Sequence, residues 1–372
     1  MAAPGLAQFR VPEGGEANSQ PSLAALLVCE TGKCDTPRVK VLFITQKKDA
    51  PSTKWRLLQF IPHFEKAGVS CAVEEMPSGL VARMTQAGRA SGYDVTVLQK
   101  RLLPKLILNR LRKNARALVF EFDDVVTLKR SDDGSIRESP TKDRRFRRTV
   151  RVADAIITTN ETLAEHARRM GADGARVHVL PTVIDLARWE PRGPSEDPKE
   201  VSIGWMGTPS NLPSVEIVRA PLVRLCRRFE KLKLKIVCES TIALEGVRMI
   251  HQPFSAQYEV SDVRSFDIAI APLVEDSWTR GKVSTKLLAY FGAGLPVVAS
   301  DVNANRLYIR DGENGYLVGT LSQWEEKLSK LIEDPELRRT VGAKARESAE
   351  KEFSLEAALP KYLSLFEKLS KP

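Results

Sequence analysis

Two lysines spaced four residues apart stand at the start of a short apolar segment. Lys282 and Lys286 belong to the stretch GKVSTKLLAYFGAGLPVVASD, which runs from Gly281 to Asp301. This stretch predicts a short helix that leads through a Gly-Ala-Gly turn into a buried strand. Residues at i and i+4 share a helix face, and the first turn of a helix carries unpaired N–H groups with partial positive charge. The spacing predicts an anion-binding site at the helix start, with a solvated helix start as the alternative.

A glycine turn and a pair of aspartates are further candidates for chemistry. Gly207 closes the turn after the apolar stretch VSIGWM, and the absence of a side chain there lets backbone N–H groups approach a phosphate. Thr208 adds a hydroxyl donor beside it, and the alternative is an ordinary turn glycine. Asp123 and Asp124 end the apolar stretch ALVFEF. A carboxylate there can orient a hydroxyl or accept its proton, and the alternative is a cap for the next segment.

Composition limits the class of protein. The chain has 372 residues, 42% of them apolar and 28% charged, as is typical of soluble globular proteins with two domains. No apolar run reaches the ~20 residues that span a bilayer, and the stretch LAALLV near the N-terminus is too short for a signal peptide. The five cysteines include no CxxC pair, so neither a disulfide framework nor a zinc site is indicated. We expect a cytoplasmic enzyme.

Basic residues gather in two segments of the first half. The net charge is +10 (57 − 47), and residues 100–116 and 137–151 each hold a cluster of lysines and arginines. Such runs are compatible with solvated helix faces and with an anionic partner. Only 6% of residues are aromatic and no stacking motif lies near the clusters, so we expect no nucleic-acid partner. We hypothesise that the clusters hold the protein against the anionic inner face of the cell membrane as a peripheral protein.

The order of apolar and helical segments predicts two α/β domains. Strand-like stretches such as VKVLFI alternate with helical stretches, which we expect at 53–66 and 214–229 among others, through both halves. This alternation is typical of doubly wound parallel sheets. A charged segment with three prolines, RWEPRGPSEDPKE, predicts an exposed linker between the halves. Ligands bind outside the carboxyl ends of parallel strands, so we expect a site in a cleft between two sheets. The predicted division is a flexible tail at 1–37, a first domain at 38–187, a linker at 188–200, a second domain at 201–350 and a returning C-terminal helix at 351–372.

An ordered set of motifs carries a resemblance to a known family. In the second half, GKVSTKLLAYFGAGLPVVASDVNAN resembles GKCGFKLLQYMAAGLPVVASPVGVN, the donor motif of a subgroup of bacterial family 4 (group 1) glycosyltransferases with the GT-B fold. VSIGWMGTPSNLP, FDIAIAPLVEDSW and IRDGENGYLV resemble other segments of that subgroup. In the first half, FEFDDV, ADAIITTNETLAEHA and VLPTVIDLARW do so in the same order. The resemblance extends from Val39 to Glu350.

The resemblance implies a fold and an activity. The fold would be GT-B, with two Rossmann-like doubly wound domains facing a cleft. The activity would be transfer of a sugar from a nucleotide-sugar donor to an acceptor hydroxyl, with retention of configuration and without a metal or other cofactor. The acceptor would be a glycan or a lipid-linked molecule, in the biosynthesis of a surface polysaccharide.

The resemblance also implies roles for the candidate residues. The anion at the lysine pair would be the donor diphosphate, whose growing charge the two ammonium groups would neutralise as the glycosidic bond breaks. The implied catalytic carboxylates are Asp123 and Asp124. The implied donor site consists of Gly207, Thr208, Glu275, Lys282 and Lys286.

The sequence departs from the family at two positions. Many members have two glutamates in the donor region, and Gly281 and Ala289 occupy those positions here. Glu275 lies a few residues earlier and is our candidate for a replacement carboxylate. Glu121 and Asp123 also form a DxD-like triplet, a metal motif of single-domain transferases that the two-domain layout disfavours. The alternatives to a transferase are an inactive binding module and a nucleotide-sugar epimerase of similar fold.

Overall fold

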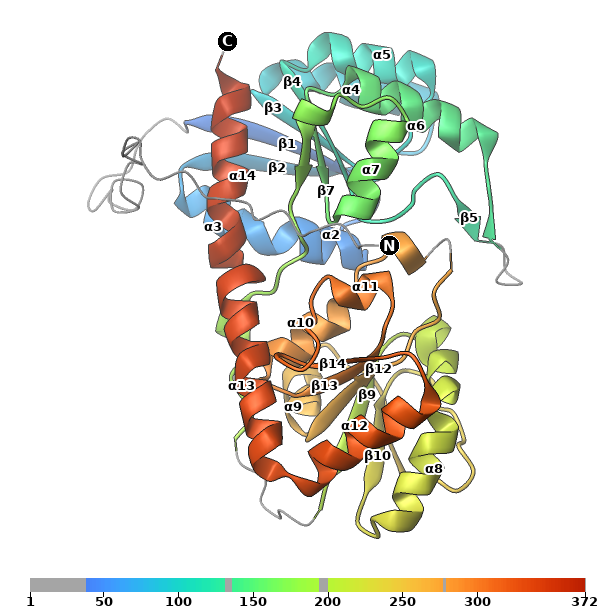
Figure 1. The fold of residues 1–372 in the computed structure, drawn as a ribbon. Coiled ribbons are helices and arrows are strands. Elements are labelled where there is room, and N and C mark those ends of the chain that lie inside the picture. The colour runs from blue at the N-terminus through green and yellow to red at the C-terminus, as the bar shows by residue number, and fades with distance from the viewer. Residues whose placement is uncertain (1–37, 131–135, 194–199, 277–278, 372) are drawn as a thin grey trace, which may run out of the picture. The chain divides into compact units, whose positions relative to one another are not determined.

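The structure is a computed structural model that describes residues 38–130, 136–193, 200–276 and 279–371 (Figure 1). The expected N-terminal tail and the middle of the expected linker lie outside these residues. The described chain contains two six-stranded sheets and a small antiparallel ribbon of β5 (Lys129–Arg130) and β6 (Ile136–Arg137). No helix among the described residues is long and apolar enough to cross a membrane.

The first sheet has the strand order β2-β1-β3-β4-β7-β8, and all of its strands are parallel. Its strands are β1 (Val39–Thr45), β2 (Val69–Glu75), β3 (Val95–Gln99), β4 (Ala117–Phe122), β7 (Ala155–Thr158) and β8 (Val177–Val179). Its helices are α2 (Pro51–Arg56), α3 (Ile61–Lys66), α4 (Leu80–Arg89), α5 (Lys105–Asn114), α6 (Pro140–Val152) and α7 (Glu161–Arg169). The strand order reverses between β1 and β3, which makes the ends of these two strands the switch point of the sheet.

The second sheet has the order β11-β10-β9-β12-β13-β14, again with parallel strands. Its strands are β9 (Ser202–Met206), β10 (Lys233–Val237), β11 (Met249–Gln252), β12 (Ile268–Ala271), β13 (Val297–Ser300) and β14 (Tyr316–Val318). Its helices are α8 (Arg219–Arg228), α9 (Glu259–Arg264), α10 (Thr285–Gly292), α11 (Asn303–Arg306), α12 (Leu321–Glu333) and α13 (Pro335–Glu352). This is the Rossmann strand order, with its switch point between β9 and β12. The α/β fold class with two such sheets is confirmed.

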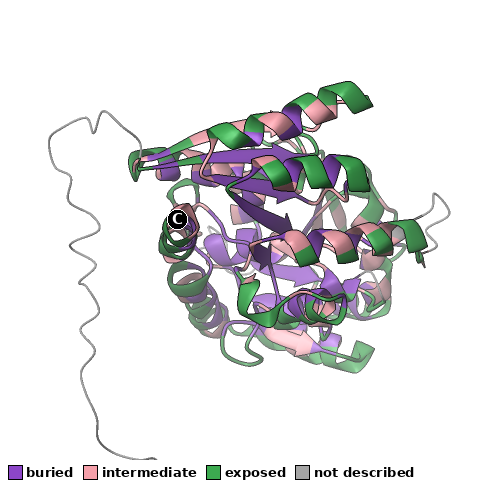
Figure 2. Ribbon diagram, turned by 90° about the horizontal axis from the view of Figure 1, so that it is seen from above, coloured by how far each residue is buried: buried purple, intermediate pink, exposed green. Residues whose placement is uncertain are grey.

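The strands supply the cores, and the helices expose one face each (Figure 2). The last helix, α14 (Leu355–Ser370), packs on the first sheet, where Leu355, Tyr362 and Phe366 join its hydrophobic core. The segment that leads into the second half and the segment that leads out of it lie side by side, because the N–H of Ile184 donates to the carbonyl of Phe353 at 2.8 Å. Burial of large apolar and aromatic side chains makes this helix part of the first core rather than a tail.

Three local expectations differ from the structure. The helix expected over residues 53–66 is broken between α2 and α3, and Pro62, which lacks an N–H donor, lies in the first turn of α3. The helix expected from Ser214 begins at Arg219, after 3-10 turns that contain Pro213. The described start of the expected exposed linker is packed, because Trp189 is buried in the second core.

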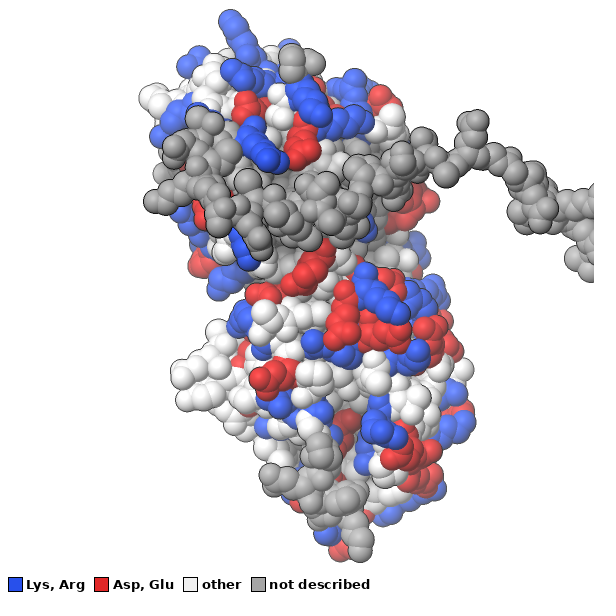
Figure 3. Space-filling model, turned by 90° about the vertical axis from the view of Figure 1, so that its left-hand side faces the viewer, with Lys and Arg blue, Asp and Glu red and all other residues white. Residues whose placement is uncertain are grey.

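The basic clusters are not uniformly solvated. Lys100 and Arg116 form ion pairs with aspartates, and Arg112 lies 3.1 Å from Asp154. Other cluster members, including Lys105 and Arg147, are exposed. The face seen in Figure 3 carries Lys and Arg side chains together with Asp and Glu side chains. The clusters thus serve the fold in part, and only their exposed members remain for an anionic partner.

Candidate donor and acceptor site

The lysine and glycine candidates of the second half meet at the switch point of its sheet. Gly207 follows β9, and Lys286 lies in the first turn of α10. The Lys286 ammonium lies over the indole of Trp205, 4.2 Å from the ring centroid. A Cβ atom on Gly207 would lie 2.6 Å from the Trp205 ring and 3.2 Å from the Lys286 Nζ. Only glycine fits this turn, and its backbone lies next to an ammonium group as an anion site requires.

Lys282 and Thr208 join this group through one side chain that sequence reasoning missed. The Nζ of Lys282 lies 3.4 Å from the Oδ1 of Asn211. The Nδ2 of Asn211 donates to the Oγ1 of Thr208 at 3.0 Å. Thr208 is exposed, so its hydroxyl remains reachable from solvent. Asn211 lies in 3-10 turns whose lack of helical periodicity gave no sequence signal for a site residue.

The charge state of Lys286 is set by its surroundings. Burial and, secondly, the positive charge of Lys282 lower the pKa of this lysine to about 7, while Cys238 acts in the opposite direction. Among the described residues, no carboxylate is paired with this ammonium. The lowered pKa means that the positive charge of Lys286 is poorly compensated by its surroundings, and Lys282 adds a second positive charge nearby. An anion bound here would compensate both charges.

The two aspartates of the first half share one lysine. Lys100 follows β3, and its Nζ lies 2.7 Å from the Oδ1 of Asp123 and 2.7 Å from the Oδ2 of Asp124. The pKa of Asp124 is raised overall, and burial is the main cause. The positive charges of Lys100 and Lys282 lower this pKa, whereas the negative charge of Asp123 raises it. Asp124 therefore lies within electrostatic reach of Lys282, one of the donor-site candidates. Sequence reasoning counted Lys100 only as a surface cation, because a lysine in a basic run shows no sign of its distant partners.

Lys100 also has an unusual backbone conformation. Its φ angle of 53° lies in the left-handed region, which residues other than glycine rarely adopt. It directly follows β3, one of the two strands at the switch point of the first sheet. With this backbone conformation, the Lys100 side chain reaches the two carboxylates that follow β4 and forms an ion pair with each.

Glu121 does not belong to a metal triplet in this structure. Its Oε1 lies 2.8 Å from the Nε of Arg56, and both side chains are buried. Arg56 also donates to the carbonyl oxygen of Leu180 at 2.8 Å. Glu121 thus acts as the buried partner of an arginine inside the first domain, whereas Asp123 and Asp124 are partly exposed.

The two positions where the family has glutamates are occupied differently here. A Cβ on Gly281 would lie 2.6 Å from Val125 and 2.9 Å from Leu163, so the first half of the chain fills the space of a side chain. The carbonyl of Gly281 accepts a hydrogen bond from the Nδ2 of Asn160 at 3.3 Å. Ala289 is fully buried in the core of the second half. Neither position leaves room for a carboxylate facing a ligand.

Glu275 lies in the loop after β12, as the sequence indicated, but it has a local partner. Its Oε1 lies 3.0 Å from the Nε of Arg280, which is largely exposed. The carbonyl of Arg280 accepts a hydrogen bond from Asn303 at 2.6 Å. Glu275 is therefore close in sequence to the lysine pair but engaged at the surface, and its donor-site role stays a prediction.

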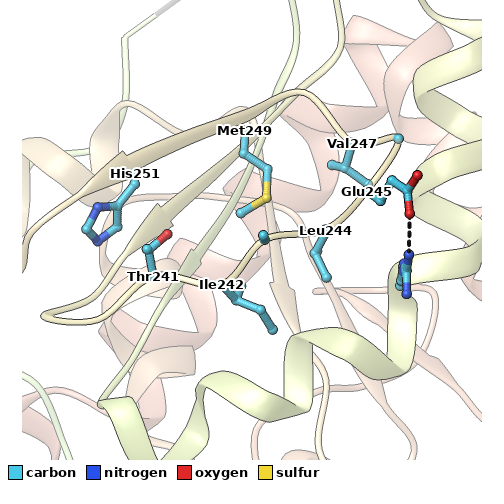
Figure 4. A pocket seen from close by; sticks show the side chains of 10 residues that line it. Thr241, Ile242, Leu244, Glu245, Val247, Met249 and His251 are labelled. Atoms are coloured by element: carbon cyan, nitrogen blue, oxygen red, sulfur yellow. Dashed lines mark ion pairs between the residues drawn. The ribbon is translucent and has the colours of Figure 1, made fainter.

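One large surface hollow lies apart from these residues (Figure 4). It has a volume of about 650 Å³ and is formed by the loop between β10 and β11, with Met249 and His251 of β11 and Arg219 of α8. Arg219 lies 3.7 Å from Glu245 in an ion pair across it. None of the predicted site residues lines this hollow.

Comparisons with known proteins show what the chain as a whole is similar to. Residues 220–334 match the family model described as "Glycosyl transferases group 1". The D-inositol 3-phosphate glycosyltransferase of Xylanimonas cellulosilytica is 26% identical over 250 residues, which cover 60% of this chain and 58% of that protein. The alpha-maltose-1-phosphate synthase of Mycolicibacterium smegmatis is 27% identical over 260 residues, 60% of this chain and 65% of that protein. The chain thus aligns with about three fifths of the length of these curated relatives.

Solved structures show the same fold. HepE from Anabaena, crystallised with UDP and glucose, has a TM-score of 0.63 at 15% identity, with 89% of this chain and 100% of that chain covered. Sucrose-phosphate synthase from Thermosynechococcus elongatus has a TM-score of 0.68 at 14% identity, with 89% and 99% covered. The chain therefore has the GT-B fold of these structures, as its sequence predicts, and residues 220–334 resemble a group 1 glycosyltransferase domain.

Proposed function

We propose that this protein transfers a sugar from a nucleotide-sugar donor to an acceptor hydroxyl. The observation that carries the proposal is the Lys286 ammonium beside the Gly207 turn, at the switch point of a Rossmann-ordered sheet. Two solved structures of this fold were determined with UDP, one of HepE and one of TarM, so a uridine nucleotide is the first to test.

The donor site would act by stabilising the leaving group. As the bond between the sugar and the diphosphate breaks, negative charge grows on the diphosphate oxygens. Lys286 and Lys282 would bind these oxygens, and the backbone at Gly207 with the Thr208 hydroxyl would donate hydrogen bonds to them. This chemistry draws only on groups of the chain itself.

The first half would receive the acceptor. Asp124, whose pKa burial raises, would orient the acceptor hydroxyl or accept its proton, with Lys100 holding the carboxylate in place. Retention of configuration and a role in surface glycan assembly belong to this proposal through the family resemblance. Many members have glutamates at positions 281 and 289, but this chain has Gly281 and Ala289 there, and neither position has space for a carboxylate. The proposed mechanism therefore uses no carboxylate from these two positions.

Donor consumption with and without an acceptor tests the proposal. The protein is incubated with a panel of nucleotide sugars, and release of the nucleoside diphosphate and conversion of the sugar are measured. A transferase releases nucleoside diphosphate slowly alone and faster with a glycan or lipid-linked acceptor. Conversion of the donor into another nucleotide sugar without an acceptor would support an epimerase. Binding of a nucleotide without any turnover would support an inactive module.

We also propose that the acceptor side lies against an anionic membrane surface. Leu80 and Val81 of α4 and Leu106 of α5 are 56%, 80% and 58% exposed, and exposed Lys105 precedes Leu106 in the sequence. Apolar side chains enter the interfacial region of a bilayer, and each nearby basic residue adds about 1 kcal/mol on an anionic surface.

Sedimentation with lipid vesicles tests the membrane proposal. The protein should bind phosphatidylglycerol vesicles at low salt and leave them at high salt, and Val81→Asp should weaken this binding. Ile250→Asp, which changes a 42% exposed apolar residue on β11, serves as the matched control. Absence of binding even at low ionic strength would leave a soluble acceptor.

A further inference from the structure

Trp205 has a position that the proposed chemistry does not explain by itself. It is fully buried on β9, and its indole face lies under the Lys286 ammonium at 4.2 Å from the ring centroid. Its ring also lies where a Cβ of residue 207 would stand, at 2.6 Å. The indole Nε1 is buried and has no hydrogen-bond partner among the described residues. A buried donor without a partner is unfavourable, so this residue is retained for its ring face rather than for its N–H group.

The surroundings of Lys286 contain few groups that can hold its charge. The titratable or charged groups that act on it are Lys282, which precedes the same helix, and Cys238, which follows β10. Trp205 on β9 is the remaining neighbour that favours the ammonium form, because the face of an indole ring attracts a cation. Within the described parts of the chain, the protonated lysine is thus held mainly by an aromatic face, and no carboxylate is paired with it as one normally is with a buried cation.

We propose that Trp205 is a positioning residue that holds Lys286 against the Gly207 turn, and that a nucleoside diphosphate binds there together with one proton. This inference rests on the proposed donor site. In the free protein, a large fraction of the Lys286 side chains would be neutral amines at or above neutral pH. The diphosphate would then draw a proton from the solvent onto the Nζ, because an ammonium beside phosphate oxygens is strongly stabilised.

The sign of the pH dependence follows from this linkage. The pKa of Lys286 is lowered to about 7 in the free protein by burial and by Lys282, and a bound diphosphate would raise it. Binding therefore takes up a proton at pH values between the free and the bound pKa. Above pH 7 the dissociation constant should rise by about tenfold per pH unit until the bound pKa is reached. Phosphate groups are almost fully ionised above pH 7.5, so their own titration does not contribute there.

Calorimetry of UDP binding in buffers with different heats of ionisation measures the proton uptake directly. At pH 8 the wild-type protein should take up close to one proton per UDP bound, and at pH 6 clearly less. Lys286→Met should bind more weakly and take up no proton. Lys286→Arg should bind without uptake, because arginine keeps its charge at every pH used.

Variants of the tryptophan separate positioning from general stability. Trp205→Leu removes the aromatic face, so the pH at which uptake is half complete should fall by about half a unit to one unit. Trp205→Phe keeps a ring and should shift this pH less. Trp324→Phe changes another buried tryptophan of the same half, on α12, and should leave the uptake unchanged.

The outcomes distinguish this inference from the donor site on which it rests. UDP binding without proton uptake at pH 8 would overturn the inference and leave the donor site standing. Uptake that is the same in Trp205→Leu and the wild type would overturn the role of the indole. Failure of UDP and of all other nucleoside diphosphates to bind would overturn both proposals.

Discussion

Replacement of Lys100 by methionine tests how the two site aspartates are held. Lys100 is the shared partner of Asp123 and Asp124 at 2.7 Å each, and the three side chains are 18%, 14% and 25% exposed. Methionine keeps most of the length of the side chain and, like lysine, has a Cβ atom at this left-handed position, so the comparison mainly tests the charge. Because the three side chains are only partly exposed, removing the lysine should cost more than breaking an exposed ion pair and less than breaking a fully buried one. We expect the unfolding free energy to fall by about 2–4 kcal/mol at pH 8.

The pH dependence of this loss follows from the two carboxylates. Without Lys100, repulsion between the neighbouring carboxylates and their burial raise at least one folded-state pKa further above its unfolded value. A raised folded-state pKa contributes stability below the unfolded pKa, and this contribution disappears as the pH rises through the folded-state pKa. The variant should therefore lose least at pH 5 and most at pH 8.

Urea unfolding followed by circular dichroism between pH 5 and pH 8 measures this effect. Lys105→Met, which removes an exposed lysine of α5, should change the unfolding free energy by less than about 0.5 kcal/mol at every pH. A Lys100→Met loss as small as that of the control, or a loss that does not change with pH, would refute the ion-pair account of the site.

Three further predictions concern buried positions. Arg56→Met should lower the unfolding free energy by about 3–5 kcal/mol, because it leaves the buried Glu121 without its charge partner, and the double variant with Glu121→Leu should recover most of this loss in urea unfolding. Gly281→Glu should lower the melting temperature strongly because its side chain overlaps Val125, whereas an unchanged melting temperature would mean that the two halves separate easily there. Ala289→Glu should also destabilise the fold in thermal unfolding, since it buries a carboxylate in an apolar core.

The fold was predictable because its strands are short apolar runs with regular spacing. VKVLFI and LPVVAS became the buried strands β1 and β13. The resemblance to a GT-B family was also readable from the order of motifs. Helix boundaries were less predictable, since Pro62 and Pro213 shift them by steric effects that apolar periodicity does not reveal.

The candidate site was predictable only in part, because its partners are distant in the chain. The helix-start signal and the glycine turn indicated Lys286 and Gly207, and the structure brings these two together. Lys100 and Asp124 are also brought together, but no local pattern links a cation in a basic run to a carboxylate in the next strand end. Likewise, Trp205 resembled any core aromatic residue until the fold placed it under an ammonium.

The binding of UDP to Lys286→Ala, compared with the wild type at pH 7, tests the central claim most directly. Loss of a charge-assisted contact of about 1.5–3 kcal/mol should weaken binding at least tenfold in calorimetry. The matched control is Lys327→Ala, because Lys327 also lies over an aromatic ring, at 5.4 Å from that of Tyr316, but belongs to α12. The control should bind UDP as the wild type does. An unchanged dissociation constant in Lys286→Ala would contradict the donor site proposed at Gly207 and Lys286.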